Sequence, residues 1–234
     1  MRRVGVWERY AWAAGVLFVV ALVAEVVVAV GVPASPGDSA AKIAAALQDH
    51  HRRLLVIAWL SAVYAVMFVI YLARLERLLC GDGGRGRVLG SWVLIGGTLF
   101  VSLHAVSDVG ITGLLGAKLA SYGQHDQGLS YTLYLVTYAL DSVGDVFGSL
   151  FAVATGVLVL RSGVLPRWLG WMSILVGVLF FAQGFGLGGV IASFGLVLDL
   201  IGFVLLLLFV LASSIVSLRS GRGVVTAQAS AVSR

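Results

Sequence analysis

Long apolar stretches alternate with short polar segments along the whole chain. A helix needs about 20 apolar residues to cross a bilayer core about 30 Å thick, and most of the stretches reach that length. Charged, proline or glycine residues separate them. The stretches cover residues 11–32, 54–73, 88–117, 131–160, 168–183 and 190–216. The pattern predicts an all-α polytopic membrane protein, a single six-helix transmembrane domain over residues 1–218, followed by a disordered cytoplasmic tail at 219–234.

Composition supports a lipid environment. Hydrophobic residues make up 60% of the chain and charged residues 12%, whereas a soluble domain carries about 25% charged residues. The formal net charge of +5 does not indicate a nucleic-acid partner, because the basic residues lie in short segments between apolar stretches, as they do in cytoplasmic loops. We therefore expect the lipid bilayer, and no nucleic acid, as the partner.

The distribution of basic residues predicts the orientation. With the N-terminus in the cytoplasm, twelve arginines fall on the cytoplasmic side, and only Lys42, Arg52, Arg53 and Lys118 fall outside. This asymmetry favours cytoplasmic N- and C-termini. The chain has fourteen arginines, two lysines and no asparagine, a bias typical of a high-GC bacterial genome. We therefore expect a multi-pass protein of the bacterial cytoplasmic membrane.

A short additional helix is predicted between the first two spans. Gly37-Asp38-Ser39 offers an N-cap to an alanine-rich segment. Ile43, Leu47 and Leu54 fall on one face of it. This pattern is typical of an interfacial helix on the outer membrane surface.

Ionisable residues within the spans are the candidates for a functional site, because a charged group at the centre of a membrane helix costs about 2.5–3.5 kcal/mol and tends to face the protein interior. At a rise of about 1.5 Å per residue, the ionisable residues lie about 24–32 Å along the helix from the cytoplasmic arginine of their span, in the outer third of the membrane. They are Glu25, His104, Asp108, Asp141, Asp145 and Asp199.

These groups have no basic neighbour in the spans. His104 and Asp108 are four residues apart, as are Asp141 and Asp145, so each pair is expected on one helix face. No lysine or arginine lies within the spans. Each carboxyl group must therefore be protonated, hydrogen-bonded, bound to a cation or paired with a base at the outer end. The outer-end candidates are His50, His51, Arg52 and Arg53.

The function that follows is an outward-facing acidic and histidine site for a proton, a cation or a small cationic ligand, in a transporter or a sensor and not an enzyme. One alternative is a membrane-embedded metal-dependent hydrolase, with the ion held by His104, Asp108, Asp141 and Asp145. The other is a structural or partner-binding module. Since neither an HExxH nor a Gly-x-Ser-x-Gly motif occurs, we expect no cofactor, with a metal ion as the open alternative.

Glycines recur every seven residues near the C-terminal end. They are Gly163, Gly170, Gly177 and Gly184, then Gly188, Gly195 and Gly202. Small residues let membrane helices approach closely, so these stripes predict packing seams within the bundle. An interface with a second copy or with a membrane partner stays open.

Two segments carry a resemblance to a known family. One is Asp49-His50-His51-Arg52-Arg53 after the alanine-rich segment, and the other is Leu165-Pro166-Arg167-Trp168-Leu169-Gly170-Trp171 at the start of span five. From Tyr10 to Leu218 the chain resembles a bacterial six-helix membrane family of unknown function. The resemblance implies the topology and no activity.

Overall fold

The computed structural model describes residues 6–30, 37–81, 86–115, 127–184 and 200–218. In this part of the chain, six helices are long and apolar enough to cross a membrane, and no strand occurs. They are α1 (Val6–Ala29), α3 (His51–Cys80), α4 (Arg87–Ala105) with its continuation, α6 (Gln127–Ser162), α7 (Arg167–Gly184) and the C-terminal helix Leu200–Leu218. The predicted all-α membrane fold is confirmed.

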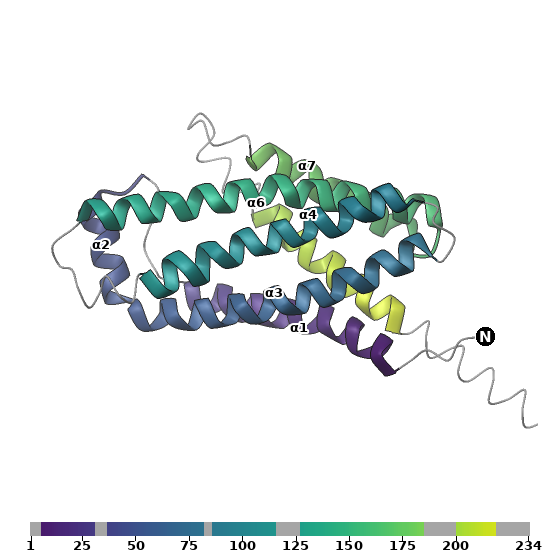
Figure 1. Ribbon diagram of the computed structural model, residues 1–234, viewed down its shortest axis with the longest axis horizontal. Helices are drawn as coiled ribbons and strands as arrows, with labels where there is room; N and C mark the ends of the chain where they lie inside the picture. Colours follow the sequence, from purple (N-terminus) through teal and green to yellow (C-terminus); the bar gives the residue numbers. More distant parts are fainter. Residues whose placement is uncertain (1–5, 31–36, 82–85, 116–126, 185–199, 219–234) are drawn as a thin grey trace, which may run out of the picture.

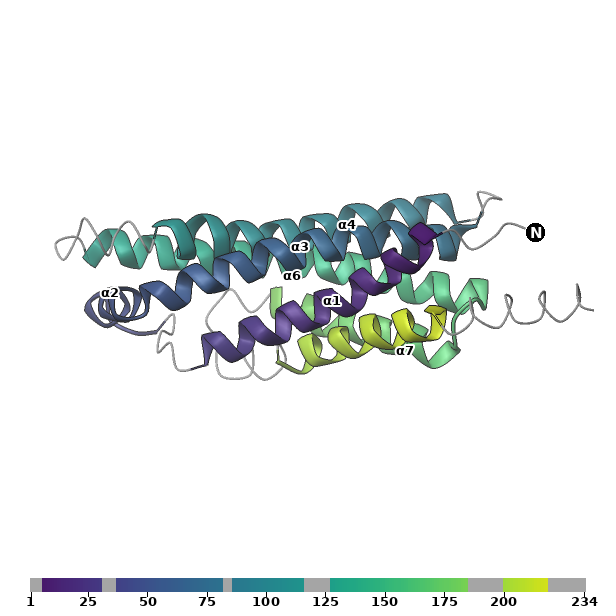
Figure 2. The ribbon, with the colours of Figure 1, turned by 90° about the horizontal axis from the view of Figure 1, so that it is seen from below.

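The long helices run along one axis, and a short helix crosses one end of the bundle (Figure 1). This short helix is α2 (Ala40–Asp49), which Figure 2 shows nearly end-on. α6 packs mainly on α4 and α7, and α1 packs on α3. The C-terminal helix lies beside α1 (Figure 2), where Gly15 comes close to Ser214. α1 begins and the C-terminal helix ends away from α2 (Figure 1).

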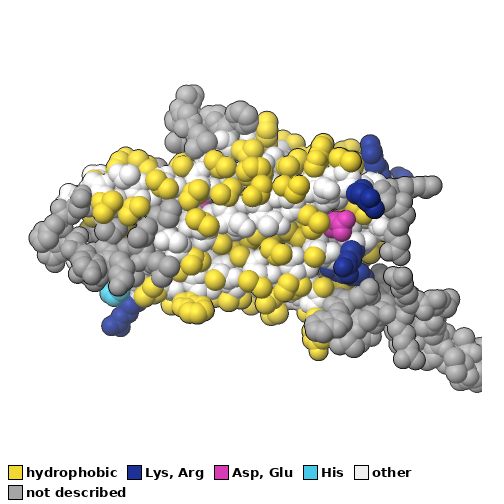
Figure 3. Space-filling model, viewed as in Figure 1, with side chains coloured by type: hydrophobic (Ala, Val, Ile, Leu, Met, Phe, Trp, Pro, Cys, Tyr) yellow, Lys and Arg dark blue, Asp and Glu magenta, His cyan; other side chains and the backbone are white. Residues whose placement is uncertain are grey.

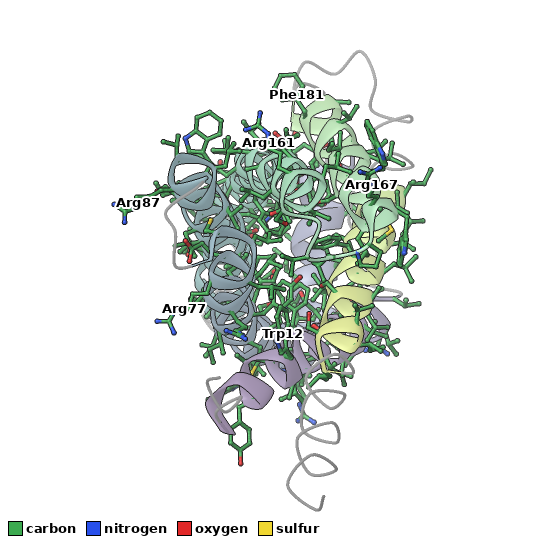
Figure 4. The ribbon with its side chains drawn as sticks, turned by 90° about the vertical axis from the view of Figure 1, so that its right-hand side faces the viewer. Trp12, Arg77, Arg87, Arg161, Arg167 and Phe181 are labelled. Atoms are coloured by element: carbon green, nitrogen blue, oxygen red, sulfur yellow. The ribbon has the colours of Figure 1, made fainter. Side chains whose placement is uncertain are left out.

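The surface of the bundle suits a bilayer. Apolar side chains cover the middle of the face in Figure 3, and basic side chains lie towards its two ends. Among the exposed apolar residues are Trp59, which is 75% exposed, Val27 and Trp171. Figure 4 looks onto the end of the bundle around which Arg77, Arg87, Arg161 and Arg167 lie. Lipid would cover the apolar middle, while headgroups and water would solvate the basic end.

The core is built around an aromatic side chain of α3. Phe68 is fully buried, and its ring centroid lies 4.7 Å from that of Phe18, 6.1 Å from that of Phe100 and 5.6 Å from that of Phe151. These partners come from α1, α4 and α6, so one side chain joins four helices. A second contact between helices is the 2.7 Å hydrogen bond of the Tyr71 and Ser213 hydroxyls. The six long helices therefore share one main core.

The glycines of α7 form a seam with α6, as predicted. A Cβ at Gly170, Gly177 or Gly184 would meet a backbone carbonyl of α6 at 3.0–3.3 Å. Gly202 faces Phe180 of α7, whereas Gly163 has a φ of +64° and forms the turn after α6. These contacts are made within the chain. Gly188 and Gly195 lie outside the described residues.

Several span boundaries differ from the prediction. The span predicted at 54–73 is the helix His51–Cys80, and the span predicted at 131–160 is Gln127–Ser162. α3 continues past Ala73 because the Arg74 guanidinium lies over the Trp12 ring of α1, 5.9 Å from its centroid, and Arg77 occupies the last turn. A cation is stabilised at a helix C-terminus. The tail 219–234 lies outside the described residues.

The region predicted as one span at 88–117 changes its helix type. α4 ends at Ala105, and the π-helix η1 (Val106–Leu115) follows it directly. π-helical turns are rare and often occur at functional sites. At Gly113, a Cβ would clash with the Ala58 side chain, so this glycine lets η1 approach α3.

The short helix α2 is present where the sequence predicts it, and Ser39 caps it by accepting a hydrogen bond from the Lys42 amide at 3.3 Å. Its environment differs from the prediction. Ile43 and Leu47 pack with Leu54 and Ile57 of α3 and with tyrosines of α6. The apolar face of α2 therefore covers the end of the bundle instead of entering lipid.

Candidate functional site

Two carboxyl groups from different helices meet at one buried hydroxyl group. The Ser61 Oγ of α3 lies 3.2 Å from the Glu25 Oε1 of α1 and 3.2 Å from the Asp108 Oδ2 of η1. The Tyr64 hydroxyl also donates to Asp108 Oδ2 at 3.4 Å. Ser61 is fully buried and Glu25 is 9% exposed. Three helices therefore share one small polar cluster, Glu25–Ser61–Asp108, in an apolar surrounding.

The number of hydrogens in this cluster limits its protonation. Ser61 has one hydroxyl hydrogen, and its oxygen also lies 3.0 Å from the Ile57 carbonyl. A hydroxyl group donates once, and an ionised carboxylate only accepts. Both contacts between Ser61 and the carboxyl groups are therefore hydrogen bonds only if Glu25 or Asp108 is protonated. The geometry thus suits a cluster that holds at least one proton.

A second polar contact joins α4 to α6. The His104 Nδ1 lies 2.9 Å from the Phe100 carbonyl, which can only accept, so Nδ1 carries a hydrogen. The other ring nitrogen, Nε2, lies 3.5 Å from Asp145 Oδ1. A proton on Nε2 makes an imidazolium–carboxylate pair, and a proton on Asp145 makes a neutral pair. A proton on either group would therefore make the contact between His104 and Asp145 favourable.

Gly144 makes room for the His104 ring. A Cβ at Gly144 would lie 2.7 Å from the His104 Cε1 and 2.7 Å from its Nδ1. The ring therefore packs directly on the backbone of α6, one residue before Asp145. This glycine is required for the distance between His104 and Asp145.

The variant Gly144→Ala is accordingly expected to displace the His104 ring and to lower the free energy of unfolding by about 1–3 kcal/mol, as overpacking does. Thermal or SDS-induced unfolding in detergent measures this loss. Gly110→Ala is the matched control, since a Cβ there would meet only the Val106 Cγ1 at 3.9 Å. Equal stability of the two variants would contradict the role assigned to Gly144.

The change from α4 to η1 directs neighbouring groups to different helices. The spacing of His104 and Asp108 predicted one shared helix face. In the structure, His104 faces Asp145 on α6, whereas Asp108 faces Ser61 and Tyr64 on α3. The π-helix begins between the two residues and changes their angular relation. His104 and Asp108 nevertheless line one cavity.

This cavity has a volume of about 140 Å³ and lies between α1, α3, α4 with η1, and the C-terminal helix. Its polar lining comes from Glu25, Tyr64, His104 and Asp108. The remaining walls are apolar. They are formed by Phe18, Leu22, Val26, Ala29, Phe100, Val101 and Phe203.

The other predicted residues are not part of the cavity lining. Asp141 is partly buried, one turn from Asp145 towards the α2 end of α6. Asp199 lies outside the described residues. In the described part of the chain, no group of three or more His, Cys, Asp or Glu side chains is placed to hold a metal ion.

The outer-end bases make local contacts. The Nδ1 atoms of His50 and His51 each lie 3.1 Å from a backbone carbonyl of α2. Arg53 donates to the Val30 carbonyl at 3.5 Å. Arg52 and Arg53 line a depression with valines of α1 and Val56. These contacts do not involve the acids.

Three further residues of this site were not predicted from the sequence, namely Ser61, Tyr64 and Gly144. Ser61 and Tyr64 are neutral, so their presence in a span carries no large energetic signal. The sequence indicated their role only through position: Ser61 and Tyr64 are three residues apart, on the helix face that also carries Phe68. For Gly144, the comparable indication was its position directly before Asp145.

A bundle of six membrane-length helices with carboxyl groups buried between them defines a polytopic integral membrane protein. The chain belongs to the family described as Domain of unknown function (DUF4386), whose model matches residues 13–215. The resemblance to a six-helix membrane family of unknown function is thereby confirmed. No curated protein and no solved structure matches the chain.

Proposed function

We propose that this protein binds a proton at a buried carboxyl and histidine site that faces the outer side of the membrane, and that it uses the site for cation-coupled transport or for sensing. The observation that carries the proposal is the pair of carboxyl groups, Glu25 and Asp108, on the single hydroxyl of Ser61. Two ionised carboxylates there would repel each other in an apolar surrounding. One shared proton removes this repulsion and completes the hydrogen bonds.

The two polar contacts adjoin the same cavity. His104 and Asp108 line the same cavity, His104 reaches Asp145 on α6, and Asp108 reaches Ser61 on α3. A proton that leaves one contact therefore has acceptors nearby in the other. Chains of aspartate, glutamate and histidine of this kind serve as proton relays in pumps and transporters.

Protonation at this site also changes the contacts between helices. The Ser61 hydroxyl joins α1, α3 and η1, and the pair of His104 and Asp145 joins α4 to α6. At Ser61, loss of a proton would replace a hydrogen bond by repulsion between two carboxylates. A change of charge that alters interhelical contacts is the physical basis of a two-state switch.

The orientation supports an outward-facing site. Arg77, Arg87, Arg161 and Arg167 surround the end of the bundle seen in Figure 4, and α2 crosses the opposite end (Figure 1). By the positive-inside rule the arginine end is cytoplasmic. Ser61 is ten residues from the start of α3 at the α2 end and nineteen from Cys80, so the site lies in the outer half.

Infrared difference spectroscopy of the purified protein between about pH 9 and about pH 5 tests the proposal, because it resolves the carbonyl stretch of protonated carboxyl groups. We expect a carboxylic acid band of wild type that Asp108→Asn and Glu25→Gln each reduce. Glu76→Gln is the matched control, since Glu76 lies near Gly90 at the arginine end. If the spectra of Asp108→Asn and Glu25→Gln are both identical to that of wild type, the proposal is overturned and a structural module is favoured.

A further inference from the structure

Two adjacent arginines lie at the start of α3, at the end of the bundle that the positive-inside rule places outside. Arg52 and Arg53 are both exposed, and neither forms an ion pair with an acid of the described residues, Asp49 included. By contrast, the Lys42 ammonium on the same side lies 2.7 Å from an Asp38 oxygen. Basic residues are less frequent on the outer side of a membrane than on the cytoplasmic side. This pair of charges is therefore a candidate for recognition of an anion.

The hydrogen-bond donors of the two arginines are largely unused. A guanidinium group carries five N–H donors. Arg53 donates to the Val30 carbonyl of α1 at 3.5 Å, and Arg52 has no hydrogen-bond partner in the described part of the chain. Guanidinium groups bind phosphate oxygens through two parallel hydrogen bonds, which makes arginine a preferred residue for phosphate recognition. The free donors of the pair thus favour a phosphate group.

An apolar surface continues from the arginines towards the middle of the membrane. Arg52 and Arg53 line a depression whose other walls are valines of α1 and α3. These valines are Val27, Val28, Val30 and Val56. Val56 and Trp59 follow Arg52 by four and seven residues, so they lie below it on one face of α3. A charged group therefore stands directly above an exposed apolar surface.

We propose that this depression binds an anionic phospholipid of the outer leaflet. The lipid phosphate accepts hydrogen bonds from both guanidinium groups, and an acyl chain lies along the valines of α1 and α3. Basic groups at the membrane interface attract anionic headgroups, and exposed valines are covered by hydrocarbon. A free phosphate would bind the arginines but leave the valines uncovered, so a lipid suits both parts of the depression. The inference is independent of the proton site, because the contacts of the two arginines do not involve its acids.

Fluorescence quenching in vesicles tests this site. Trp59 is 75% exposed and lies about 10 Å below Arg52 at a rise of about 1.5 Å per residue. The full-length protein is placed in phosphatidylcholine vesicles that contain a small, equal fraction of brominated phosphatidylglycerol or brominated phosphatidylcholine. The difference between wild type and Trp59→Phe gives the signal of Trp59. We expect at least about fivefold preference for phosphatidylglycerol at Trp59, the contribution of one interfacial arginine.

The double variant Arg52→Gln/Arg53→Gln should abolish this preference. The matched control is Arg77→Gln/Arg87→Gln, which removes the same charge from two exposed arginines at the other end of the bundle (Figure 4). The control should keep the preference at Trp59. If the double variant does not fold, Arg52→Gln replaces it and should weaken the preference, because Arg52 has no hydrogen bond to a described residue that the change would remove.

Equal quenching of Trp59 by the two brominated lipids in wild type overturns the lipid site. A preference that Arg52→Gln/Arg53→Gln leaves unchanged overturns it as well, and so does a preference that the control also loses, since net charge alone would then attract the lipid. Loss of the preference in wild type on addition of millimolar glycerol 3-phosphate would show that the arginines hold a soluble phosphate instead of a lipid. Loss of the preference in the Arg52 and Arg53 variant alone, without an effect of glycerol 3-phosphate, supports the phospholipid.

Discussion

The variant Asp145→Leu is expected to lower the free energy of unfolding by about 2–3 kcal/mol, because it leaves the partly buried His104 side chain without its carboxyl partner. Asp145 is 3% exposed and its Oδ1 lies 3.5 Å from the His104 Nε2. The double variant His104→Phe/Asp145→Leu removes both groups and should recover part of this loss. The coupling energy of the double-mutant cycle is expected at about 0.5–3 kcal/mol. Steric-trap or SDS unfolding measures all four proteins.

The chain offers a matched control for this cycle. Lys42 and Asp38 form an exposed ion pair at 2.7 Å, with side chains that are 56% and 19% exposed. An i, i+4 pair at the surface contributes about 0.3–0.5 kcal/mol. A coupling energy of His104 and Asp145 no larger than that of Lys42 and Asp38 would show that the buried pair is not formed.

The fold was predictable from the sequence because the bilayer imposes one strong requirement. Every backbone polar group in a membrane must be satisfied, so an apolar stretch of sufficient length is a helix. The ends of the helices were not predictable to the same degree. Arg74 and Arg77 interrupt the apolar pattern, yet α3 continues to Cys80, since a charged side chain near a helix end reaches an aromatic ring or the headgroups.

Part of the site was predictable for an energetic reason. An acid in a span is expensive, so Glu25, Asp108 and Asp145 stood out from their apolar neighbours. The structure buries Glu25 and Asp145 between helices and partly buries Asp108. Their partners did not stand out. Ser61 is a small neutral residue of a kind common in membrane helices, and only the crossing of α1, α3 and η1 gives its hydroxyl a role.

The pairing of the acids required the structure. The four-residue spacing of His104 and Asp108 predicted one shared face, and the two side chains do line one cavity. Since η1 begins at Val106, the two side chains contact different helices. Likewise, the position of Arg53 along the chain suggested a countercharge, whereas its guanidinium group donates to the Val30 carbonyl. Neither the π-helix nor this backbone acceptor can be read from residue types.

The variant Gly96→Leu is expected to separate α4 from α6 and to destabilise the protein by about 3 kcal/mol or more, at or above the usual range for overpacking. A Cβ at Gly96 would lie 2.8 Å from the Phe151 amide nitrogen and 2.9 Å from the Phe147 carbonyl oxygen. Both atoms belong to the backbone of α6, so no side chain can move aside. The helices themselves would have to separate.

This separation should also disrupt the candidate site, because His104 is eight residues further along α4, about 12 Å at 1.5 Å per residue. Gly90→Leu is the control on the same helix. A Cβ there would meet the side chains of Cys80 and Glu76, which can move. Unfolding and the infrared carboxyl band are measured for both variants. If Gly96→Leu has the same free energy of unfolding and the same infrared carboxyl band as Gly90→Leu, the close contact of the α4 and α6 backbones is not what positions His104 beside Asp145.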